Sequence, residues 1–558
     1  MGIATTRYQE RALASTGYLP FVNPFFENNE GLSHAGVLFA LPALMSQGLF
    51  DYRKIYSELK NGYYGFDSVM LILAFMALWR IKNPEQIKQN KVGELGRVLG
   101  LDRIPETKCL RKKIKEIQFQ NKAKDFNLLL FDKWLGDTES LFFYVDGHVS
   151  VYHGHKANLT SKYVSRQKLC LAATTEFWVN DDQGMPYLVV TGELSEKLQE
   201  MILTLIIPQI LSLTQIQNRK EKNEAVLFTL VFDREAYSPS FFMDLWIKFK
   251  IAVVTYRKSV KDKWDEKLFK PHQIQVIGNS VNKLLYEQEV TLKGCPFREV
   301  RCLGEGGHQT AIITTNPEIN MTTIASKMFS RWSQENFFKY MIADFDFDKM
   351  VSYEVEAVDE NRTVTNPVYR QLTYNIKNMR GKKIRLEAKF YPVLEKMKDE
   401  PIDYIPKISS KLSEYKNQIQ ALKNDINESI TKRSACQSKI KLLQMPKEKK
   451  YNKLKTESKL FLNIIKMICY RAETSLTMLI APFFKNEQKE KRMLIKQIFN
   501  SPANLTPDYT NQTLTVNLYS LSTPRFNAAV QELCSLLNES ETLFPNTNLK
   551  LIFKTTAN

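Results

Sequence analysis

The sequence predicts an α/β protein with a mixed central sheet, and three features lead to that fold class. Short apolar runs rich in β-branched and aromatic residues recur in the middle of the chain, separated by turn-forming residues. These runs come in the order β-β-β-α-β, because a helix-like stretch from Ser195 to Leu213 follows three of them and precedes AVLFTLVFD. The first and fourth of the expected strands each end in an aspartate.

Three acidic residues are the candidate catalytic and metal-binding residues. Asp146 and Asp233 each close an apolar strand, and Glu335 lies within the helix-like segment RWSQENFFKYM. This order of elements, with an aspartate after the first and fourth strands, is that of a ribonuclease H-like sheet. Phosphodiester cleavage with two Mg²⁺ ions needs hard oxygen ligands from separate elements around an open position. An aspartate at a strand end is also a common turn former, and Gly147 fits that alternative equally well.

The segment around Glu335 has the spacing of a helix. Arg331, Glu335 and Lys339 recur every four residues, so they project from one side. An arginine beside a metal-binding glutamate can bind a phosphate through two hydrogen bonds while the glutamate stays ionised. Without the two aspartates, the same spacing would be interpreted as a surface row of ion pairs, each worth about 0.2–0.5 kcal/mol.

These residues resemble those of the DDE transposases of bacterial insertion sequences, and most closely the IS4-like group. That group carries Tyr, two residues, Arg, three residues, Glu, six residues and Lys around its glutamate. Here Arg331 and Glu335 match, and Trp332 agrees with members that have Arg-Trp. Met328 stands at the Tyr position and Ile342 at the Lys position, so the resemblance supports the metal ligands better than the contacts to the DNA end.

The resemblance implies an Mg²⁺-dependent DNA transposase that acts as endonuclease and strand transferase. Asp146, Asp233 and Glu335 would hold two Mg²⁺ ions, for which Mn²⁺ can substitute, and Arg331, Trp332 and Lys339 would contact DNA. The enzyme would cleave at transposon ends and join the freed 3′-hydroxyl to target DNA, as a homodimer on double-stranded DNA. The alternative is a catalytically inactive or domesticated relative that binds DNA and recruits partners through a coiled coil.

A β-rich insertion is expected within the catalytic domain, which is predicted at residues 139–350. The stretch from about 261 to 315 contains short β-like runs separated by Gly, Asn and Pro. In the IS4-like transposases that the sequence resembles, such an insertion helps to hold the transposon end. Trp264 is a candidate for stacking there, although an aromatic residue in a small β domain more often belongs to its core.

Residues 1–138 are expected to form a helical N-terminal domain that could bind the DNA end. Its apolar patches are short of membrane-spanning length and are interrupted by Pro42 and Gly48 or flanked by charge, as in buried helices. A solvated helix face explains the basic residues of this region as well as DNA binding does. The candidate phosphate contacts are Arg111, Lys112, Lys113 and Lys115.

Residues 406–485 are expected to form an antiparallel helical hairpin. Mostly apolar positions from Ile408 to Leu443 keep an alternating spacing of four and three, the pattern of a coiled coil. Pro446 separates them from a second helical run at 453–479, which favours pairing within the chain. Residues 432–459 would give the hairpin a cationic tip that could follow a DNA backbone. The other expected segments are a connecting β or irregular segment at 351–405 and a small α/β region at 486–558.

Composition favours a polyanionic partner. The chain has 78 Lys and Arg against 60 Asp and Glu, a net charge of +18. No apolar run approaches the ~20 residues that span a bilayer, so no membrane partner is expected. The seven cysteines are scattered and include no CxxC pair, so the sequence predicts no disulfide framework and no zinc site. The expected location is the bacterial cytoplasm, in association with the nucleoid.

Overall fold

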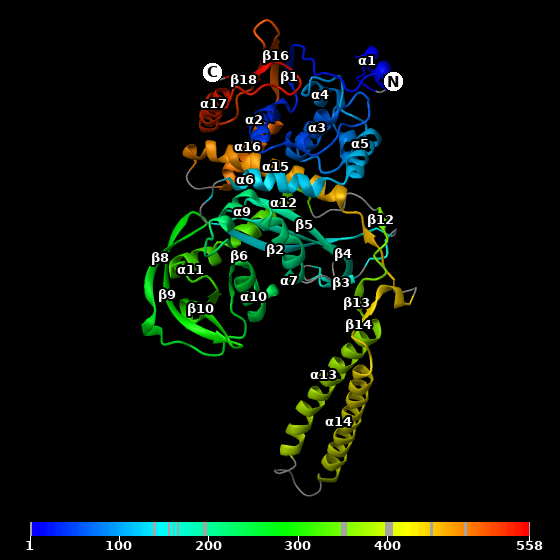
Figure 1. Cartoon of the computed structure of the whole chain (residues 1–558), viewed down its shortest axis with the longest axis vertical. Helices are drawn as coiled ribbons and strands as arrows, with labels where there is room; N and C mark the ends of the chain where they lie inside the picture. Colours follow the sequence, from blue (N-terminus) through cyan, green and yellow to red (C-terminus); the bar gives the residue numbers. More distant parts are fainter. Residues whose placement is uncertain are drawn as a thin grey trace. The chain divides into compact units, whose positions relative to one another are not determined.

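The chain divides into two structural units (Figure 1). Unit 1 comprises residues 1–153, 160–353 and 455–558, and unit 2 comprises residues 154–159 and 354–454. The predicted domain boundaries at residues 139, 350 and 351 lie outside the described residues. This computed structural model describes residues 3–136, 138, 141–154, 157–159, 161–164, 167–193, 198–347, 354–396, 405–446, 450–484 and 488–556.

A mixed sheet of ten strands forms the middle of unit 1, which confirms the mixed α/β class. Its order is β3-β4-β2-β6-β7-β11-β10-β9-β8, with β5 also paired to β4. Strand β2 runs antiparallel to β4 and parallel to β6, and β6 runs parallel to β7. All five residues of β6 are buried, as expected for a parallel strand covered on both faces. The strands are β2 Phe142–Val151, β3 Ser161–Val164, β4 Leu169–Asn180, β5 Pro186–Glu193, β6 Phe228–Phe232, β7 Ile251–Tyr256, β8 Lys270–Val276, β9 Asn279–Leu292, β10 Cys295–Leu303 and β11 Gln309–Thr314.

The β-rich stretch at 261–315 extends this sheet and does not form a separate sheet of its own. Strand β11 pairs antiparallel with β7, and β10, β9 and β8 follow in turn. The expected helix from Ser195 is described from Leu198, and it contains a π-helical turn at Ile202–Ile206 just before Pro208. The helices beside the sheet are α6 Ala123–Leu135, α7 Leu198–Met201, α8 Ile207–Leu211, α9 Thr214–Glu221, α10 Pro239–Phe249, α11 Met321–Phe329 and α12 Trp332–Phe345.

The N-terminal and C-terminal regions share one hydrophobic core, which corrects the prediction of a separate, wholly helical domain at 1–138. Strand β1 pairs with β16 in a four-stranded sheet of order β1-β16-β17-β18. Helix α3 is buried on nearly every side, so it needs partners all round, and α15 is one of them. The elements are α1 Tyr8–Ser15, β1 Asn29–Leu32, α2 Leu41–Ser46, α3 Phe66–Leu78, α4 Val92–Arg97, α5 Thr107–Gln120, α15 Glu457–Leu479, α16 Gln488–Asn500, β16 Ala503–Asp508, β17 Thr513–Leu518, α17 Pro524–Glu539 and β18 Lys550–Thr555.

A hairpin of two long helices dominates unit 2 (Figure 1), but its helices are not the predicted pair. Residues 351–405, expected to be β or irregular, contain α13 Pro367–Lys396, and α13 packs on α14 Ile405–Ser434. The predicted second helix is α15, which is buried within unit 1. The many charged residues of α13, with Gly381 and Pro392, hide its helical pattern in the sequence.

The end of the predicted seam also differs from the structure. Helix α14 ends at Ser434, and Ile440 lies in a short strand, so the cationic stretch at 432–459 is not a hairpin tip. The side chain of Ile408 lies outside the described residues. Leu412, Ile419 and Ile426, at intervals of seven, are buried as the pattern predicts. The short strands of unit 2 pair as β12 Val355–Glu356 with β15 Lys453–Leu454 and as β13 Thr363–Thr365 with β14 Lys439–Lys441.

Within the described ranges, no single helix is both long and apolar enough to cross a membrane. One bent pair, Leu198–Leu211 with Thr214–Glu221, would pass by length and composition alone.

Candidate active site

The two aspartates lie just beyond the paired residues of two parallel strands. Asp233 directly follows β6, as predicted, but Asp146 does not close its strand, because β2 continues to Val151 in antiparallel pairing with β4. Strands β2 and β6 pair with Tyr144 opposite Val231. Asp146 and Asp233 each follow two residues later, so they leave the paired region in register with each other. Parallel strands deliver their carboxyl ends to the same edge of a sheet, which explains why residues so distant in sequence meet here.

Each aspartate is oriented by a hydrogen bond from the next residue in the chain. The backbone N–H of Gly147 donates to Oδ1 of Asp146 at 2.8 Å, and that of Arg234 donates to Oδ1 of Asp233 at 2.7 Å. Asp233 thereby caps the helical turn Arg234–Ala236, whereas the predicted turn at Asp146 and Gly147 is wrong, because both residues lie within β2 and pair with β4. The hydrogen bond is nevertheless alike in the two residues. It occupies only one oxygen of each carboxylate, so the Oδ2 atoms remain for the site.

Arg331 brings the three predicted acids together. Its guanidinium nitrogens lie 3.9 Å from Oδ2 of Asp146 and 4.0 Å from Oδ2 of Asp233. The same group donates a hydrogen bond of 3.1 Å to Oε1 of Glu335. Carboxylates from β2, the end of β6 and α12 thus surround one cation, and we call these three acids the acidic cluster.

Gln334 fixes α12 against the sheet beside this cluster. Its side chain is fully buried, and its amide nitrogen donates to the carbonyl oxygens of Tyr144 at 3.1 Å and Trp178 at 3.3 Å. Because Tyr144 precedes Asp146 by two residues, these bonds relate the positions of Glu335 and Asp146 directly. The sequence analysis missed Gln334, since a single glutamine carries no periodic or motif signal.

A close backbone contact fixes the same helical turn. Gly184, in the turn between β4 and β5, has a φ of +81°, and a Cβ there would lie 2.9 Å from the carbonyl oxygen of Ser333. A larger residue would push α12 away from the sheet, so a glycine is required at this position.

Burial raises the pKa of Asp146 to about 6. Desolvation of the carboxylate is the largest cause, and the charges of Glu235 and Asp233 act in the same direction. The positive charge of Arg331 and the N–H of Gly147 oppose the shift. Carboxylates that lie close together repel each other when both are charged. A bound cation relieves this repulsion, so such a cluster attracts cations.

A protein-family model described as "Transposase protein" matches residues 2–557 of the chain. The chain belongs to this transposase family. No curated protein matches it. Among solved structures, the transposase is similar to the piggyBac transposase synaptic complex with hairpin DNA, with 10% sequence identity, coverage of 86% of this chain and 84% of that chain, and a TM-score of 0.29.

The three carboxylates of the transposase suit a hard divalent cation by their chemistry, but their present spacing does not. Within the described ranges, no group of three or more His, Cys, Asp or Glu side chains is placed to hold a metal ion. Arg331 accounts for this, because its guanidinium lies between the acids. Oxygen donors of this kind are the ligands that Mg²⁺ prefers, so the donor set fits if Arg331 moves out.

The predicted DNA contacts differ in their accessibility. On α12, Trp332 and Lys339 are exposed, with 54% of Trp332 accessible to solvent. On α5, Lys113 is buried and donates to the carbonyl oxygen of Lys60 at 2.8 Å, which contradicts its prediction as a phosphate contact. The reason is that Lys113 falls on the apolar face of α5, where a long side chain must reach a polar partner.

The other basic residues of α5 are at the surface. Arg111 forms an ion pair with Glu85 at 2.6 Å, whereas Lys112 is exposed and Lys115 lies 5.7 Å from the ring centroid of Phe119. In the insertion, the ring of Trp264 covers the buried guanidinium of Arg301 at 3.9 Å. That face of the ring is therefore used inside the protein and is not free to stack on a base.

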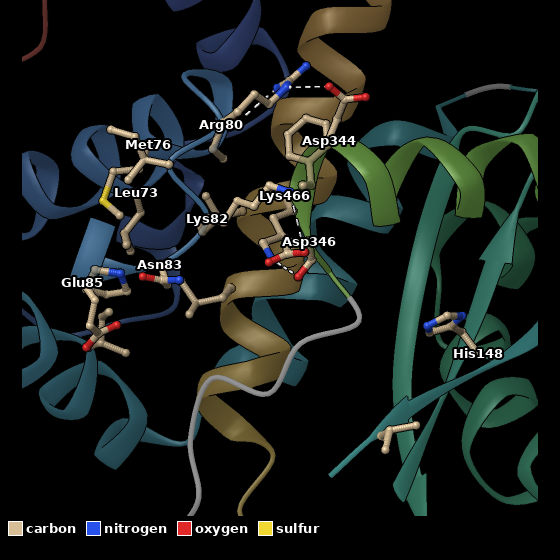
Figure 2. A pocket seen from close by; sticks show the side chains of 18 of the residues that line it. Leu73, Met76, Arg80, Lys82, Asn83, Glu85, His148, Asp344, Asp346 and Lys466 are labelled. Atoms are coloured by element: carbon tan, nitrogen blue, oxygen red, sulfur yellow. Dashed lines mark hydrogen bonds and ion pairs between the residues drawn. The ribbon is translucent and has the colours of Figure 1, made fainter. Parts of the chain in front are cut away.

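A cavity of about 570 Å³ lies apart from the acidic cluster (Figure 2). Asp146, Asp233 and Glu335 do not line it. Two of its cations are paired with acids: Arg80 with Asp344 at 3.2 Å and Lys82 with Asp346 at 3.7 Å (Figure 2). Lys466 donates a hydrogen bond to the backbone carbonyl of Asp346 at 3.4 Å. The two ion pairs reduce the positive charge that Arg80 and Lys82 can offer a phosphate.

Proposed function

We propose that this transposase is a DNA-cleaving and strand-joining enzyme of the IS4-like DDE group, with Asp146, Asp233 and Glu335 as its catalytic residues. The observation that carries the proposal is the convergence of these three carboxylates on one guanidinium, within 4.0 Å. They come from distant parts of the chain and from three elements. A surface row of ion pairs along one helix would not include residues of β2 and from the end of β6.

The order of the sheet supports a ribonuclease H-like core. Strands β5, β4, β2, β6 and β7 are neighbours in that order, and the pairing changes from antiparallel to parallel at β2. Asp146, within β2, and Asp233, directly after β6, both lie two residues beyond the last pair of the β2–β6 ladder, Tyr144 and Val231, in the centre of this arrangement. A site at the carboxyl ends of parallel strands is the usual place for ligands in such sheets.

The chemistry would follow from the donor set. When bound, two Mg²⁺ ions stabilise the attacking and leaving oxygens of a phosphodiester in an in-line displacement. Asp146, Asp233 and Glu335 would hold them, and Arg331 would bind a neighbouring phosphate oxygen. Hydrolysis at the transposon end breaks the bond between phosphorus and the 3′-oxygen and leaves a 3′-hydroxyl. That hydroxyl then attacks a target phosphodiester and displaces the target's own 3′-oxygen.

Double-stranded DNA is the proposed partner, and the net charge of +18 favours such a polyanion. Trp332 and Lys339, exposed on the same helix as Glu335, are the proposed contacts near the site. A homodimer on DNA and a location beside the bacterial nucleoid belong to the same proposal and rest on the resemblance to the IS4-like group.

An inactive, DNA-binding relative is the second candidate, and two residues favour it. Met328 and Ile342 replace the Tyr and Lys of the IS4-like pattern. Met328 is fully buried, and Ile342 packs against the core of unit 1, so both positions serve packing and not DNA. The acidic cluster itself is complete, which is why we place catalysis first.

Asp146→Asn decides between the two candidates. We expect it to abolish Mg²⁺-dependent cleavage of a DNA fragment that carries the gene and its flanking sequences, while the Kd for that fragment, measured without divalent metal, changes by less than about twofold. Asp244→Asn is the matched control, because Asp244 is exposed on α10 and pairs with Lys248 on the same helix. Cleavage retained by purified Asp146→Asn, or absent from the wild type, would reject the catalytic proposal.

A further inference from the structure

Arg331 occupies the place that the proposed metal ions require. Its side chain is 13% exposed, and its ion-pair partners among the described residues all belong to the acidic cluster. The Oδ1 atoms of the two aspartates are held by backbone N–H groups. Arg331 contacts Oδ2 of Asp146, Oδ2 of Asp233 and Oε1 of Glu335, so a metal ion held by all three acids through these atoms would take the place of the guanidinium.

A guanidinium and a divalent cation cannot share these three oxygens. Three carboxylates close together repel one another, and a single positive charge among them relieves part of that repulsion. A divalent ion would relieve more of it, but only after Arg331 has left. The released guanidinium would then be a largely buried cation without a partner, which is strongly unfavourable.

A phosphate oxygen beside the cluster removes this penalty. Arginine binds phosphate through two parallel hydrogen bonds, and it stays charged under all ordinary conditions. A DNA phosphate is therefore a second negatively charged partner for Arg331, besides the acidic cluster. Metal binding frees the arginine for DNA, and DNA in turn frees the acids for the metal.

We propose that Arg331 acts as a stand-in cation that couples divalent metal binding to DNA binding. The inference rests on the proposed function, since it takes the acidic cluster as the metal site. Without DNA, Arg331 holds the three carboxylates and weakens metal binding. With DNA, it transfers to a phosphate and the metal affinity rises. Linkage requires the reverse effect to be of equal size: metal must tighten DNA binding by the same factor.

The test measures Mn²⁺ binding by electron paramagnetic resonance on the full chain, with and without the DNA fragment. We expect Arg331→Ala to bind Mn²⁺ about tenfold more tightly than the wild type when DNA is absent, a typical size for such coupling. Arg331→Gln gives a second variant of nearly the same length if the alanine variant is unstable. Arg234→Ala is the matched control, because it removes a nearby positive charge whose guanidinium lies beside the ring of Tyr256 and, within the described ranges, forms no ion pair with the acidic cluster.

DNA binding provides a second measurement. Without metal, Arg331 is engaged by the acids, so Arg331→Ala should leave the Kd for DNA nearly unchanged. With Ca²⁺, which occupies such sites without supporting rapid cleavage, the same change should weaken DNA binding about tenfold. The coupling is rejected if Arg331→Ala and Arg234→Ala affect Mn²⁺ binding equally, or if DNA tightens Mn²⁺ binding as much in Arg331→Ala as in the wild type.

The carboxylate variants separate this inference from the proposed function. Asp146→Asn and Asp233→Asn should each lose most Mn²⁺ binding whatever Arg331 does. If they bind Mn²⁺ like the wild type, the metal site lies elsewhere and both proposals fail. If they lose Mn²⁺ while the arginine variants change nothing, the catalytic site stands and only the coupling is wrong.

Discussion

The acidic cluster and the α13–α14 hairpin are held together by different kinds of contact. Around the cluster, α12 is fixed by the buried amide of Gln334 and by the close approach of Gly184 to its backbone. Between the hairpin helices, a row of aliphatic side chains such as Ile376 and Ile419 provides most of the burial. Directional contacts specify a position, whereas an aliphatic row mainly specifies that two helices lie together.

The far end of α12 is fixed in the same directional way. Glu473 of α15 is fully buried and accepts from Arg80 at 2.8 Å, from Arg492 at 3.2 Å and from the hydroxyl of Tyr340. Tyr340 lies on α12, so this buried ion cluster holds the helix that carries Glu335. Both ends of α12 are therefore determined by polar contacts that would be costly to leave unpaired.

The hairpin, by contrast, offers a long exposed surface. Its helix α13 carries eight Lys and Arg against two Glu. Large apolar side chains of α13 are also exposed, among them Tyr374 at 60%, Ile384 at 64% and Tyr391 at 61%. A surface of this kind can meet a partner by charge and contact area without a fixed geometry. The comparison shows that directional hydrogen bonds and close backbone contacts fix the helix beside the three carboxylates, whereas apolar packing joins the hairpin helices.

The largest expected effect follows from removing the amide of Gln334. Gln334→Met keeps the length of the side chain but loses both hydrogen bonds, so α12 is free to move relative to Asp146. We expect DNA cleavage to fall about 100-fold and Mn²⁺ affinity to fall with it, because small displacements of a catalytic group have effects of that size. Cleavage rates and Mn²⁺ binding are measured well below the unfolding temperature of each variant.

The matched change in the hairpin is Gln420→Met, which removes a hydrogen bond from Gln420 to Asn424 on the exposed side of α14. It should leave both measurements unchanged. If Gln334→Met lowers only the unfolding temperature and leaves Mn²⁺ affinity intact, Gln334 is a stability residue and the contrast between the two regions is lost.

A smaller effect is expected from the hairpin core. Ile376 is 2% exposed, so Ile376→Ala should destabilise the hairpin by about 2 kcal/mol through lost burial and a cavity. Hydrogen exchange of the α13 and α14 amides measures this directly, and cleavage should be unaffected. Ile384→Ala, on the exposed face of the same helix, should change exchange by less than about 0.5 kcal/mol. Equal effects of the two substitutions would mean that Ile376 is not part of the packed face.

The hairpin also shows what the sequence could predict and what it could not. The buried positions Leu412, Ile419 and Ile426 follow from their spacing of seven. The sequence does not identify α13 as the helix that packs on α14. The buried positions of α14 require an apolar partner, and α15 has a stronger apolar pattern than the highly charged α13. Likewise, the pairing of β1 with β16 joins segments more than 450 residues apart, and short strands carry too little local signal to choose each other.

The region around the acidic cluster was more readable because its signals are local. Asp233 ends a buried strand as predicted, whereas Asp146 lies within β2, which continues to Val151. Arg331 and Glu335 share a helical face, so the types and spacing of these residues predict a site before any fold is known. The prediction of a transposase is confirmed by the family match over residues 2–557, whereas membership of the IS4-like group stays a prediction. Gln334 could not be predicted, since its role depends on carbonyl groups of Tyr144 and Trp178 far away in the chain.

The smallest expected effect is the loss of folding stability caused by the charged form of Asp146 in the acidic cluster. The folded pKa of Asp146, about 6, lies above its ordinary value of 3.8. The native state therefore binds this proton more tightly than the unfolded chain does, and that stabilisation is lost as pH rises from about 4 through 6. A shift of this size corresponds to about 3 kcal/mol at most, and the partial exposure of the side chain reduces it to about 1 kcal/mol.

Asp146→Asn removes the charge and with it this pH dependence. In metal-free buffer, the variant should gain about 1 kcal/mol of stability relative to the wild type between pH 4.5 and pH 7.5, measured by chemical unfolding at each pH. Asp244→Asn, at an exposed position, should show no such change. If the Asp146→Asn difference is the same at both pH values, burial does not disfavour the charge of Asp146. The charge of Asp146 would then cost the fold no more stability than a charge on the hairpin surface. The difference between the two regions would rest on the hydrogen bonds of Gln334 alone.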